Sequence, residues 1–559
     1  MKARQLRARL LALLAVAAVA LTGCGRGASV SGMNRAVGGT DINPLPRDQV
    51  RDGGDLRLPL LAMPNNYNYN EVDGRHVDVL AMAGAVLPAL FRATADGGLA
   101  GNPDYLVSAE VTSTAPQVIT YTLNPDATWT DGTPITWRDF AAYWHSSSGT
   151  DPAYRAAGIT GYDSISTVTR GADDRQAVIT FGSPYAEWRN LFNPFLPAAL
   201  TSTAAAFNTA WRTSLPVSAG PFAVDTIDPV AKTITLTRNP RWWGSQPKLD
   251  RIIFKVYEPS ATPDALANNE LDFYKIGPNV DLLRRAEQTP GAAVRRSASR
   301  YYTQVSFNAV PGAALADPRL RAAVARSIDR AGITRRMLGQ IEPEARPDGN
   351  HLYAPGSAGY RDNSDALPFD PGHANQTLDQ LGYPPATAAS NARQRGGQPL
   401  RLRLIYGAAA SYQDIATAVR DQLERLGVSV DLRQYPSNEI FPNLSGGNFD
   451  MALFTWYDTA SPLSDAMDIY RSPVGDNPRL NYGRVSNSEV DALFAQGIAE
   501  PDEARRAAIG NQIDRLIWRE AHSVPLYAWP GAVAVRANLA NFGAFGFADT
   551  DYINAGFAI

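Results

Sequence analysis

Residues 402–432 constrain the fold most, because they contain a strand, a helix and a second strand in close succession. The apolar positions that carry the pattern are Leu402 and Leu404, then Ile415, Val419, Leu423 and Leu426, then Val428, Val430 and Leu432. Gly427 ends the predicted helix. A strand–helix–strand unit of this length places its two strands parallel, joined by a right-handed crossover. The chain is therefore predicted to be α/β.

Other local signals predict further elements. Asp228-Pro229 separates two strand-like runs and predicts a hairpin. Thr136, followed three residues later by Asp139, predicts a helix start, as does Asp317 before Pro318. No internal repeat accompanies these elements. The globular part, about 510 residues, exceeds what one hydrophobic core holds, so we expect two or three lobes.

The first residues are typical of an exported protein. Four basic residues precede the uncharged run 10–21, which is too short to span a bilayer as a helix. The tetrad Leu21-Thr22-Gly23-Cys24 resembles the bacterial lipobox, whose cysteine is lipid-modified and becomes the first mature residue. Cys24 is the only cysteine, so a disulfide within the exported chain is excluded. We expect residues 1–23 to be a signal peptide and Cys24 to be the lipid anchor.

Composition favours a flexible tether after Cys24 and argues against a nucleic-acid partner. Residues 25–50 are rich in glycine and lack aromatic side chains, so they are predicted to form a coil reaching roughly 25–30 Å. The precursor has a net charge of −3, which becomes more negative once the basic signal is removed. An excess of arginine over lysine indicates a GC-rich genome, as in actinobacteria.

No catalytic machinery is visible in the sequence. The chain lacks G-x-S-x-G, H-E-x-x-H and P-loop patterns, and its five histidines show no metal-ligand spacing. Ser245-Gln246-Pro247-Lys248 fits S-x-x-K, but no K-T-G or S-D-N companion follows and Pro247 disfavours the required helix. We therefore predict no enzyme activity, cofactor or metal, and a surface hydrolase using Ser245 and Lys248 remains the weakest alternative.

One stretch points to a family. Arg238-Asn239-Pro240-Arg241-Trp242-Trp243-Gly244, followed by Pro247-Lys248-Leu249-Asp250-Arg251-Ile252-Ile253-Phe254-Lys255, closely resembles the signature of peptide-type (family 5) solute-binding proteins of ABC importers. Other blocks follow in the family's order: 121–136, 219–222, 265–272, 307–308, 317–323 and 328–330. The resemblance covers roughly residues 54 to 535. Within the signature, we expect Trp242 and Trp243 to pack against the sheet.

The resemblance implies a class II, cluster C periplasmic-binding-protein-like fold, with two hinged lobes, an extra subdomain and a ligand enclosed between the lobes. By position we expect a signal peptide at 1–23, a lipidated tether at 24–50, lobe I at 51–72, 200–285 and 520–559, its inserted subdomain at 73–199, and lobe II at 286–519. Because the closed state of such a protein depends on its ligand, we expect only the closed, loaded form to dock productively on a permease.

The resemblance also implies which residues hold the ligand. Family members meet a peptide's ammonium with the aspartate of W-x-x-D-Y, and here Trp456, Tyr457 and Asp458 stand at that place, with Asp458 one residue early. Such a shift turns the carboxylate to the other strand face unless a bulge restores it, so a turn-capping role for Asp458 stays open. The predicted second set is Tyr67, Tyr69, Asn70 and Glu71, which could equally form a solvated polar loop.

Taken with the lipobox, the resemblance implies a monomeric protein on the outer face of the cytoplasmic membrane. It would capture peptides or another small solute and deliver them to an ABC importer permease. Two alternatives keep the fold: a regulator of envelope glycolipid synthesis, and a binder of haem, a nickel chelate or a glycan. Capture of a permease rather than a glycosyltransferase in a pull-down would separate import from regulation.

Overall fold

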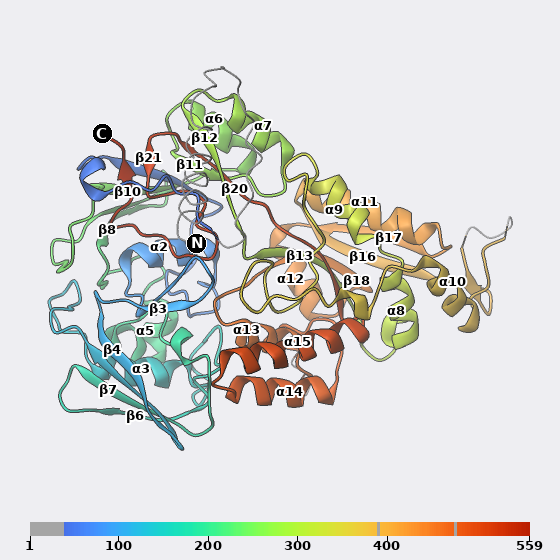
Figure 1. Ribbon diagram of the computed structural model, residues 1–559, viewed down its shortest axis with the longest axis horizontal. Helices are drawn as coiled ribbons and strands as arrows, with labels where there is room; N and C mark the ends of the chain where they lie inside the picture. Colours follow the sequence, from blue (N-terminus) through green and yellow to red (C-terminus); the bar gives the residue numbers. More distant parts are fainter. Residues whose placement is uncertain (1–38, 388–391, 474–477) are drawn as a thin grey trace, which may run out of the picture. The chain divides into compact units, whose positions relative to one another are not determined.

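The computed structural model describes residues 39–387, 392–473 and 478–559, so Cys24 and the predicted signal lie outside the described residues (Figure 1). Four sheets of three or more strands organise this part of the chain. The first has the order β1-β10-β9-β8, from Asp55–Leu60, Arg251–Val256, Thr233–Arg238 and Phe222–Asp228. The strands β8 and β9 form the hairpin predicted at Asp228-Pro229. Helix α2 (Val77–Val86) packs against β8.

A second sheet has the order β4-β5-β7-β6, from Leu106–Thr114, Gln117–Leu123, Gln176–Phe181 and Ile165–Arg170. Helix α3 (Trp137–Ser147) contacts β6 and β7, and α4 (Ala198–Thr201) and α5 (Ala204–Thr209) follow. Thr136 and Asp139 form a complete capping box at the start of α3, which confirms the predicted N-cap. A short pair, β2 (Phe91–Ala93) with β3 (Leu99–Gly101), leads into β4.

The largest sheet has five strands in the order β17-β16-β18-β13-β19, from Ser429–Tyr435, Arg401–Gly407, Met451–Tyr457, Tyr301–Phe307 and Ser523–Ala528. The strands β16 and β17 pair in parallel and are joined by α11 (Ala410–Glu424), as predicted from the apolar pattern. The other helices of this region are α8 (Pro318–Arg326), α9 (Arg330–Leu338), α10 (Pro371–Gln380), α12 (Ser437–Ser445), α13 (Pro462–Tyr470), α14 (Ser488–Ala499) and α15 (Glu503–Arg519). Asp317 caps α8 with Pro318 at its first position, which confirms that prediction.

A three-stranded sheet, β11-β20-β12, supplies both chain connections to the five-stranded sheet. Its strands are Phe273–Lys275, Gly531–Arg536 and Ala292–Ser297, with α6 (Thr262–Ala267) and α7 (Val280–Gln288) beside them. One connection runs from β12 to β13 and the other from β19 to β20. They lie side by side, because Trp529 N donates a 2.8 Å hydrogen bond to Tyr301 O. Gly531 permits this approach, since a Cβ there would overlap the Ser297 and Ala298 carbonyl oxygens.

Sheet pairing departs from the predicted lobe boundaries at two points. The strand β12 (Ala292–Ser297) pairs with β20, although it lies beyond the predicted end of lobe I at 285. The strand β19 (Ser523–Ala528) pairs with β13, although it lies beyond the predicted end of lobe II at 519. In both cases the lobe ends one strand later than predicted, just before a connection between sheets. Local sequence patterns do not mark these positions.

The described part of the predicted tether, residues 39–50, is ordered instead of forming a free coil. Asp41 and Ala544 exchange backbone hydrogen bonds of 2.8 and 2.9 Å, and Val50, which is 1% exposed, bridges to Ala558. The short helix η1 (Arg47–Gln49) lies between these contacts. The composition predicts a coil because this segment has little apolar surface of its own, and the structure supplies partners from the far end of the chain.

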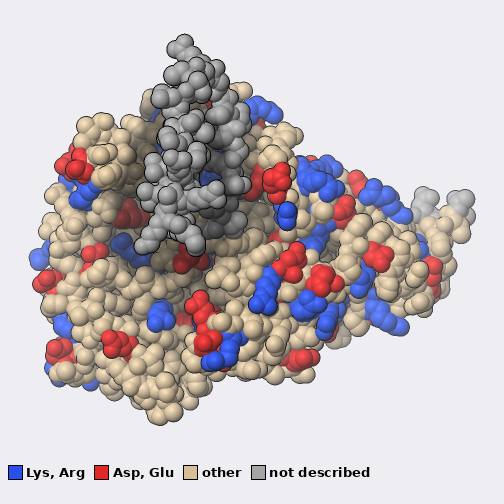
Figure 2. Space-filling view, in the orientation of Figure 1, with Lys and Arg blue, Asp and Glu red and all other residues tan. Residues whose placement is uncertain are grey.

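The two signature tryptophans have the structural role expected of them. Trp243 Nε1 donates a 2.8 Å hydrogen bond to Asp104 O, and Trp242 Nε1 donates one of 2.9 Å to Ser245 O. Both rings contact the buried ring of Tyr105. On the face shown in Figure 2, basic and acidic side chains are interspersed, so the basic side chains do not gather there into one continuous surface.

Candidate functional site

The two connections between sheets carry a cluster of aromatic rings. Tyr301 opposes Tyr457 in the pairing of β13 with β18, and their ring centroids are 4.8 Å apart. The centroid of the Trp529 ring lies 5.4 Å from that of the Tyr301 ring. Tyr457 is 37% exposed, so part of this aromatic surface remains open to a ligand. We call Tyr301, Tyr457 and Trp529 the aromatic cluster.

Lys275 brings a cation to the aromatic cluster from the three-stranded sheet. Its Nζ lies 3.4 Å from the Tyr301 hydroxyl and 5.4 Å from the centre of that ring. The side chain is accessible, yet the surrounding protein lowers the pKa of Lys275 by desolvation. Burial raises the pKa of Tyr301 to about 12, so its hydroxyl remains a neutral hydrogen-bonding group at physiological pH.

Asp458 follows the last residue of β18 and has no hydrogen-bond or ion-pair partner for its side chain among the described residues. Its backbone N donates a 2.9 Å hydrogen bond to Arg300 O, which fixes it at the end of the strand pair. Burial raises the pKa of the Asp458 carboxyl well above its usual range, and the carboxylates of Asp465 and Asp348 raise it further. The charge of Arg300 lowers this pKa, but not enough to offset the other effects. A partly buried carboxylate without an ion-pair partner gains from a cationic ligand.

Two arginines near these carboxylates also lack an ion pair with any described residue. The Arg300 guanidinium donates a 2.7 Å hydrogen bond to Phe547 O and lies 5.2 Å from the Phe547 ring centre. The Arg75 guanidinium lies 4.9 Å from the centre of the Tyr69 ring. Their charges lower the pKa of Asp465, so they act on the same region as the carboxylates. Unpaired charges of both signs therefore stand close to an accessible aromatic surface.

The structure separates the predicted residues of the first polar segment. Tyr69 is partly buried and raises the pKa of both Tyr301 and Tyr457 by electrostatic repulsion, so it stays among the candidate site residues. Asn70 is partly buried, and its Nδ2 has no hydrogen-bond partner among the described residues. Tyr67 is instead a core residue, 3% exposed, and burial raises its pKa to about 12.

Glu71 also lies in the interior. It is fully buried, and its Oε2 accepts hydrogen bonds of 3.0 Å from Asn66 Nδ2 and 2.8 Å from Asp73 N. Its Oε1 lies 3.2 Å from Arg155 Nη1. Oε1 makes this ion pair without a hydrogen bond of suitable geometry. Because Oε2 has two donors and the carboxylate has a cation nearby, we interpret Glu71 as a group that stabilises the fold.

The predicted residues at the end of β18 divide between its two faces. Trp456 stacks on Tyr482 with ring planes 4° apart, and its Nε1 is buried without a hydrogen-bond partner. Tyr457 contacts Tyr301 on the opposite face, as strand alternation requires. The Asp458 carboxylate raises the pKa of Tyr302, the residue that pairs with Trp456 between β13 and β18. Asp458 comes after the last residue of β18, so strand alternation assigns its carboxylate to neither face.

Sequence reasoning missed Lys275, Arg300, Tyr301 and Trp529. Each lies within or beside a connection between sheets, and none belongs to a recognised motif block. The one available signal was the run Arg300-Tyr301-Tyr302 at the start of a strand, where a cation and an aromatic ring precede the apolar positions.

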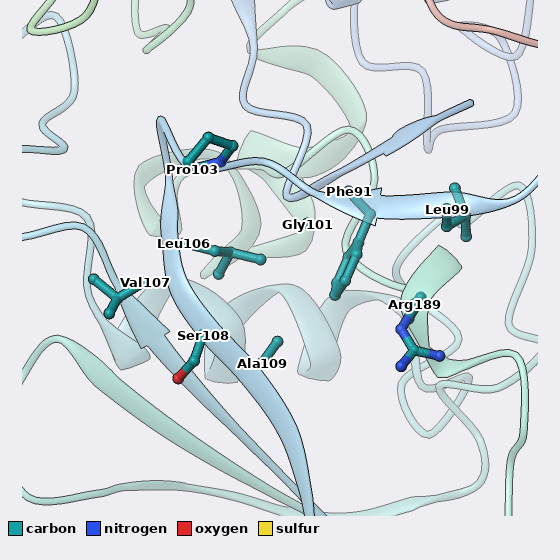
Figure 3. A pocket seen from close by; sticks show the side chains of 9 residues that line it. All are labelled: Phe91, Leu99, Gly101, Pro103, Leu106, Val107, Ser108, Ala109 and Arg189. Carbon is teal, nitrogen blue, oxygen red and sulfur yellow. The ribbon is translucent and has the colours of Figure 1, made fainter. Parts of the chain in front are cut away.

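A surface cavity of about 440 Å³ lies elsewhere, between β3, β4 and η2 (Trp188–Asn190) (Figure 3). Its lining includes Phe91, Leu106 and the exposed Arg189. No residue of the five-stranded sheet or the aromatic cluster lines it. We therefore place the candidate site at the connections between sheets, where the unpaired charges lie.

The groups at this site offer charge, hydrogen-bond and ring contacts to a ligand. In the described ranges, no group of three or more His, Cys, Asp or Glu side chains is placed to hold a metal ion. Lys248, the basic residue of the S-x-x-K match, forms a 2.9 Å ion pair with Asp52. Opposite charges beside aromatic surfaces and strand ends suit a zwitterion that is held by hydrogen bonds and ring contacts.

Known proteins resemble this chain in both sequence and fold. Residues 102–478 match the family described as bacterial extracellular solute-binding proteins, family 5 Middle. The oligopeptide-binding protein OppA of Mycobacterium tuberculosis (strain ATCC 25618 / H37Rv) is 41% identical over 553 residues, which cover 97% of this chain and 92% of the relative.

Two solved structures resemble the fold closely. The periplasmic EDTA-binding protein EppA has a TM-score of 0.86 at 24% identity and covers 95% of this chain and 100% of its own. The oligopeptide-binding protein AppA from Bacillus subtilis, solved with a nonapeptide, has a TM-score of 0.74 at 18% identity and covers 91% and 100%. These likenesses confirm the predicted α/β, two-lobed fold.

Proposed function

The chain belongs to family 5 of the bacterial extracellular solute-binding proteins, and on that premise we propose that it binds peptides at the aromatic cluster for delivery to an ABC importer. The family binds solutes and works outside the cytoplasm. The 41% identity to an oligopeptide-binding protein, extending over nearly the full length of both chains, supports peptides as the ligand.

The observation that carries the proposal is the set of unpaired charges beside the aromatic cluster. Asp458 offers a carboxylate for a peptide ammonium, and Arg300 and Lys275 offer cations for a carboxylate or for peptide carbonyls. Beyond Leu453, β18 pairs with β13 alone, so its other edge offers backbone groups to an extended chain. A peptide is zwitterionic and rich in hydrogen-bonding groups, so it matches all three features.

Delivery requires the protein to stay near its permease. No helix among the described residues has the length and apolar character needed to cross a bilayer. We place the attachment at Cys24, through lipid on the outer face of the cytoplasmic membrane, and propose that the protein acts as a monomer. Residues 39–50 are held against the body, so this part of the predicted tether does not act as a free linker.

The proposal is tested by measuring peptide binding to the mature chain. Defined peptides with free amino termini, the same peptides N-acetylated, and metal–EDTA chelates would be titrated in parallel by calorimetry. Saturable binding of the free peptides, weaker binding of the acetylated ones and none of the chelates would support it. Binding of chelates alone would refute the peptide assignment.

A further inference from the structure

A carboxylate from one hydrophobic cluster caps a helix that belongs to another. Glu187 precedes η2, whose Trp188 packs in the cluster shared by the β1 and β4 sheets. Helix α13 packs through its own apolar residues in a separate cluster with α14 and α15. Glu187 Oε1 accepts a 3.2 Å hydrogen bond from Leu463 N, and Oε2 accepts from Ser464 N at 2.9 Å and from the Ser464 hydroxyl.

This contact has no substitute within α13 itself. The N-cap residue, Ser461, makes no side-chain capping hydrogen bond, and Pro462 at the first position has no N–H. The first amides of a helix lack intrahelical partners, and a carboxylate there also meets the positive end of the helix dipole. The capping of Leu463 N and Ser464 N therefore comes from Glu187.

Neighbouring contacts join the same two regions. The Tyr185 hydroxyl lies 2.7 Å from Ser464 Oγ, and Ala186 N donates a 2.6 Å hydrogen bond to Ile498 O in α14. Thr160 Oγ1 donates one of 3.2 Å to Asp468 Oδ2 in α13. Figure 1 shows α13 and α14 beside the chain that follows β6 and β7. Glu187 is 8% exposed within this contact.

The capped turn connects directly to Asp458. Asp465, the residue after Ser464, accepts a 2.6 Å hydrogen bond from Thr459 N through Oδ2. Ser461 N donates one of 3.1 Å to Thr459 Oγ1. Thr459 is the next residue after Asp458, whose own amide is fixed to Arg300 O. The loop between β18 and α13 is thus held at both ends, and Glu187 holds the α13 end.

We propose that Glu187 is a positioning residue of the ligand site. While the two regions are in contact, Glu187 fixes the start of α13 and thereby the position of Asp458. The inference rests on the proposed function, because it takes Asp458 as the group that meets the ligand. Under this inference, contact between the two regions places Asp458 correctly for the ligand. Ligand binding therefore favours the contact, and the contact raises the affinity for the ligand.

The test combines amide exchange with binding of a free-amine peptide and uses Glu187→Ala, Glu187→Gln and Asp458→Asn. In the ligand-free protein, Glu187→Ala is expected to remove exchange protection at Leu463, Ser464 and Thr459. It is expected to weaken peptide binding about tenfold, the effect of losing a strong cap. Glu187→Gln, which keeps one acceptor oxygen, should give an intermediate loss.

The decisive comparison is made in the Asp458→Asn background. A positioning role predicts that Glu187→Ala no longer changes the peptide affinity once Asp458 is gone. Asp139→Asn is the matched control, because Asp139 is a buried carboxylate that accepts from two backbone amides, Thr136 N and Ala198 N, and touches no residue of α13. It should lower the melting temperature and leave the peptide affinity unchanged.

Three results would overturn the inference: unchanged exchange at Leu463 and Ser464, unchanged affinity in Glu187→Ala, or an equal loss in the Asp458→Asn background. If the wild-type protein binds no peptide, the proposed function fails independently of Glu187. In that case the exchange measurement decides: loss of exchange protection at both Ser464 and Thr459 in Glu187→Ala would support the positioning role, and retained protection would reject it.

Discussion

The Asp458 amide donates a 2.9 Å hydrogen bond to the Arg300 carbonyl, yet the carboxylate and guanidinium of the two residues form no ion pair. Arg300 directs its guanidinium to Phe547 O instead. The backbone contact holds two opposite charges at neighbouring strand ends while leaving the carboxylate free for a ligand. This arrangement underlies the predictions about Asp458.

Replacing Asp458 with asparagine should weaken binding of free-amine peptides about tenfold to a hundredfold, because a charge-assisted hydrogen bond is lost. N-acetylated peptides, which carry no ammonium, should bind the variant and the wild type equally. Calorimetry on the two peptide series measures both effects. Equal losses for free and acetylated peptides would show that the substitution acts through the fold and not through the ammonium.

Peptide affinity should fall on acidification. The pKa of Asp458 is raised in the ligand-free protein, and a bound ammonium favours the ionised carboxylate, so a protonated Asp458 must release its proton on binding. Affinity is therefore fully present above that raised pKa and declines as the pH falls through it. Calorimetry across the acidic range should show this decline in wild type and not in Asp458→Asn. A flat wild-type profile would contradict it.

Removing the ring of Tyr457 should weaken peptide binding about tenfold, because Tyr457→Ala deletes an accessible face of the aromatic cluster. Tyr457→Phe should bind nearly as well as wild type, since the ring is retained. Phe369→Ala is the control, because Phe369 is 52% exposed and lies outside the cluster. Similar affinities for Tyr457→Ala and Phe369→Ala would exclude the ring from the site.

Replacing Glu71 with alanine should lower stability by about 2–5 kcal/mol and leave peptide affinity unchanged. The reason is that Asn66, Asp73 N and Arg155 would lose their buried carboxylate partner. Urea unfolding gives the stability, and binding is measured under conditions where the variant remains folded. A large loss of affinity in folded Glu71→Ala would return Glu71 to the ligand-contacting set.

Replacing Cys24 with serine should release the protein from membranes. Acyl chains on Cys24 would provide the attachment, and no described helix could span the bilayer in their place. Fractionation of cells that express each form measures the shift to the soluble fraction, and a metabolically incorporated lipid probe measures modification. Membrane association that persists without lipid on residue 24 would refute the anchor.

The sequence predicts those parts of the fold that depend on local patterns. The Thr136 and Asp317 caps, the Asp228-Pro229 hairpin and the unit formed by β16, α11 and β17 each rest on short-range spacing. Residues 39–50 were misjudged because the partner of Asp41 is Ala544, at the other end of the chain. Apolar content within a segment gives no information on such distant pairing.

The candidate site shows the same division. Tyr457 and Asp458 were found because they stand in a recognisable block, whereas Lys275 and Trp529 meet Tyr301 only after two distant connections come together. Glu71 is predicted to hold the ligand because it stands roughly at an acidic ligand-contacting position of the family. Its burial follows from contacts with Asn66 and Arg155, and the latter lies far along the chain.

Thermal unfolding of the mature chain with a graded series of free-amine peptides tests the central claim most directly. A ligand at a hundred times its Kd should add about 2.7 kcal/mol to the free energy of unfolding, with one peptide bound per chain. The account predicts this stabilisation in wild type and a much smaller one in Asp458→Asn at the same peptide concentration. No stabilisation by any peptide, together with stabilisation by a different solute, would contradict it.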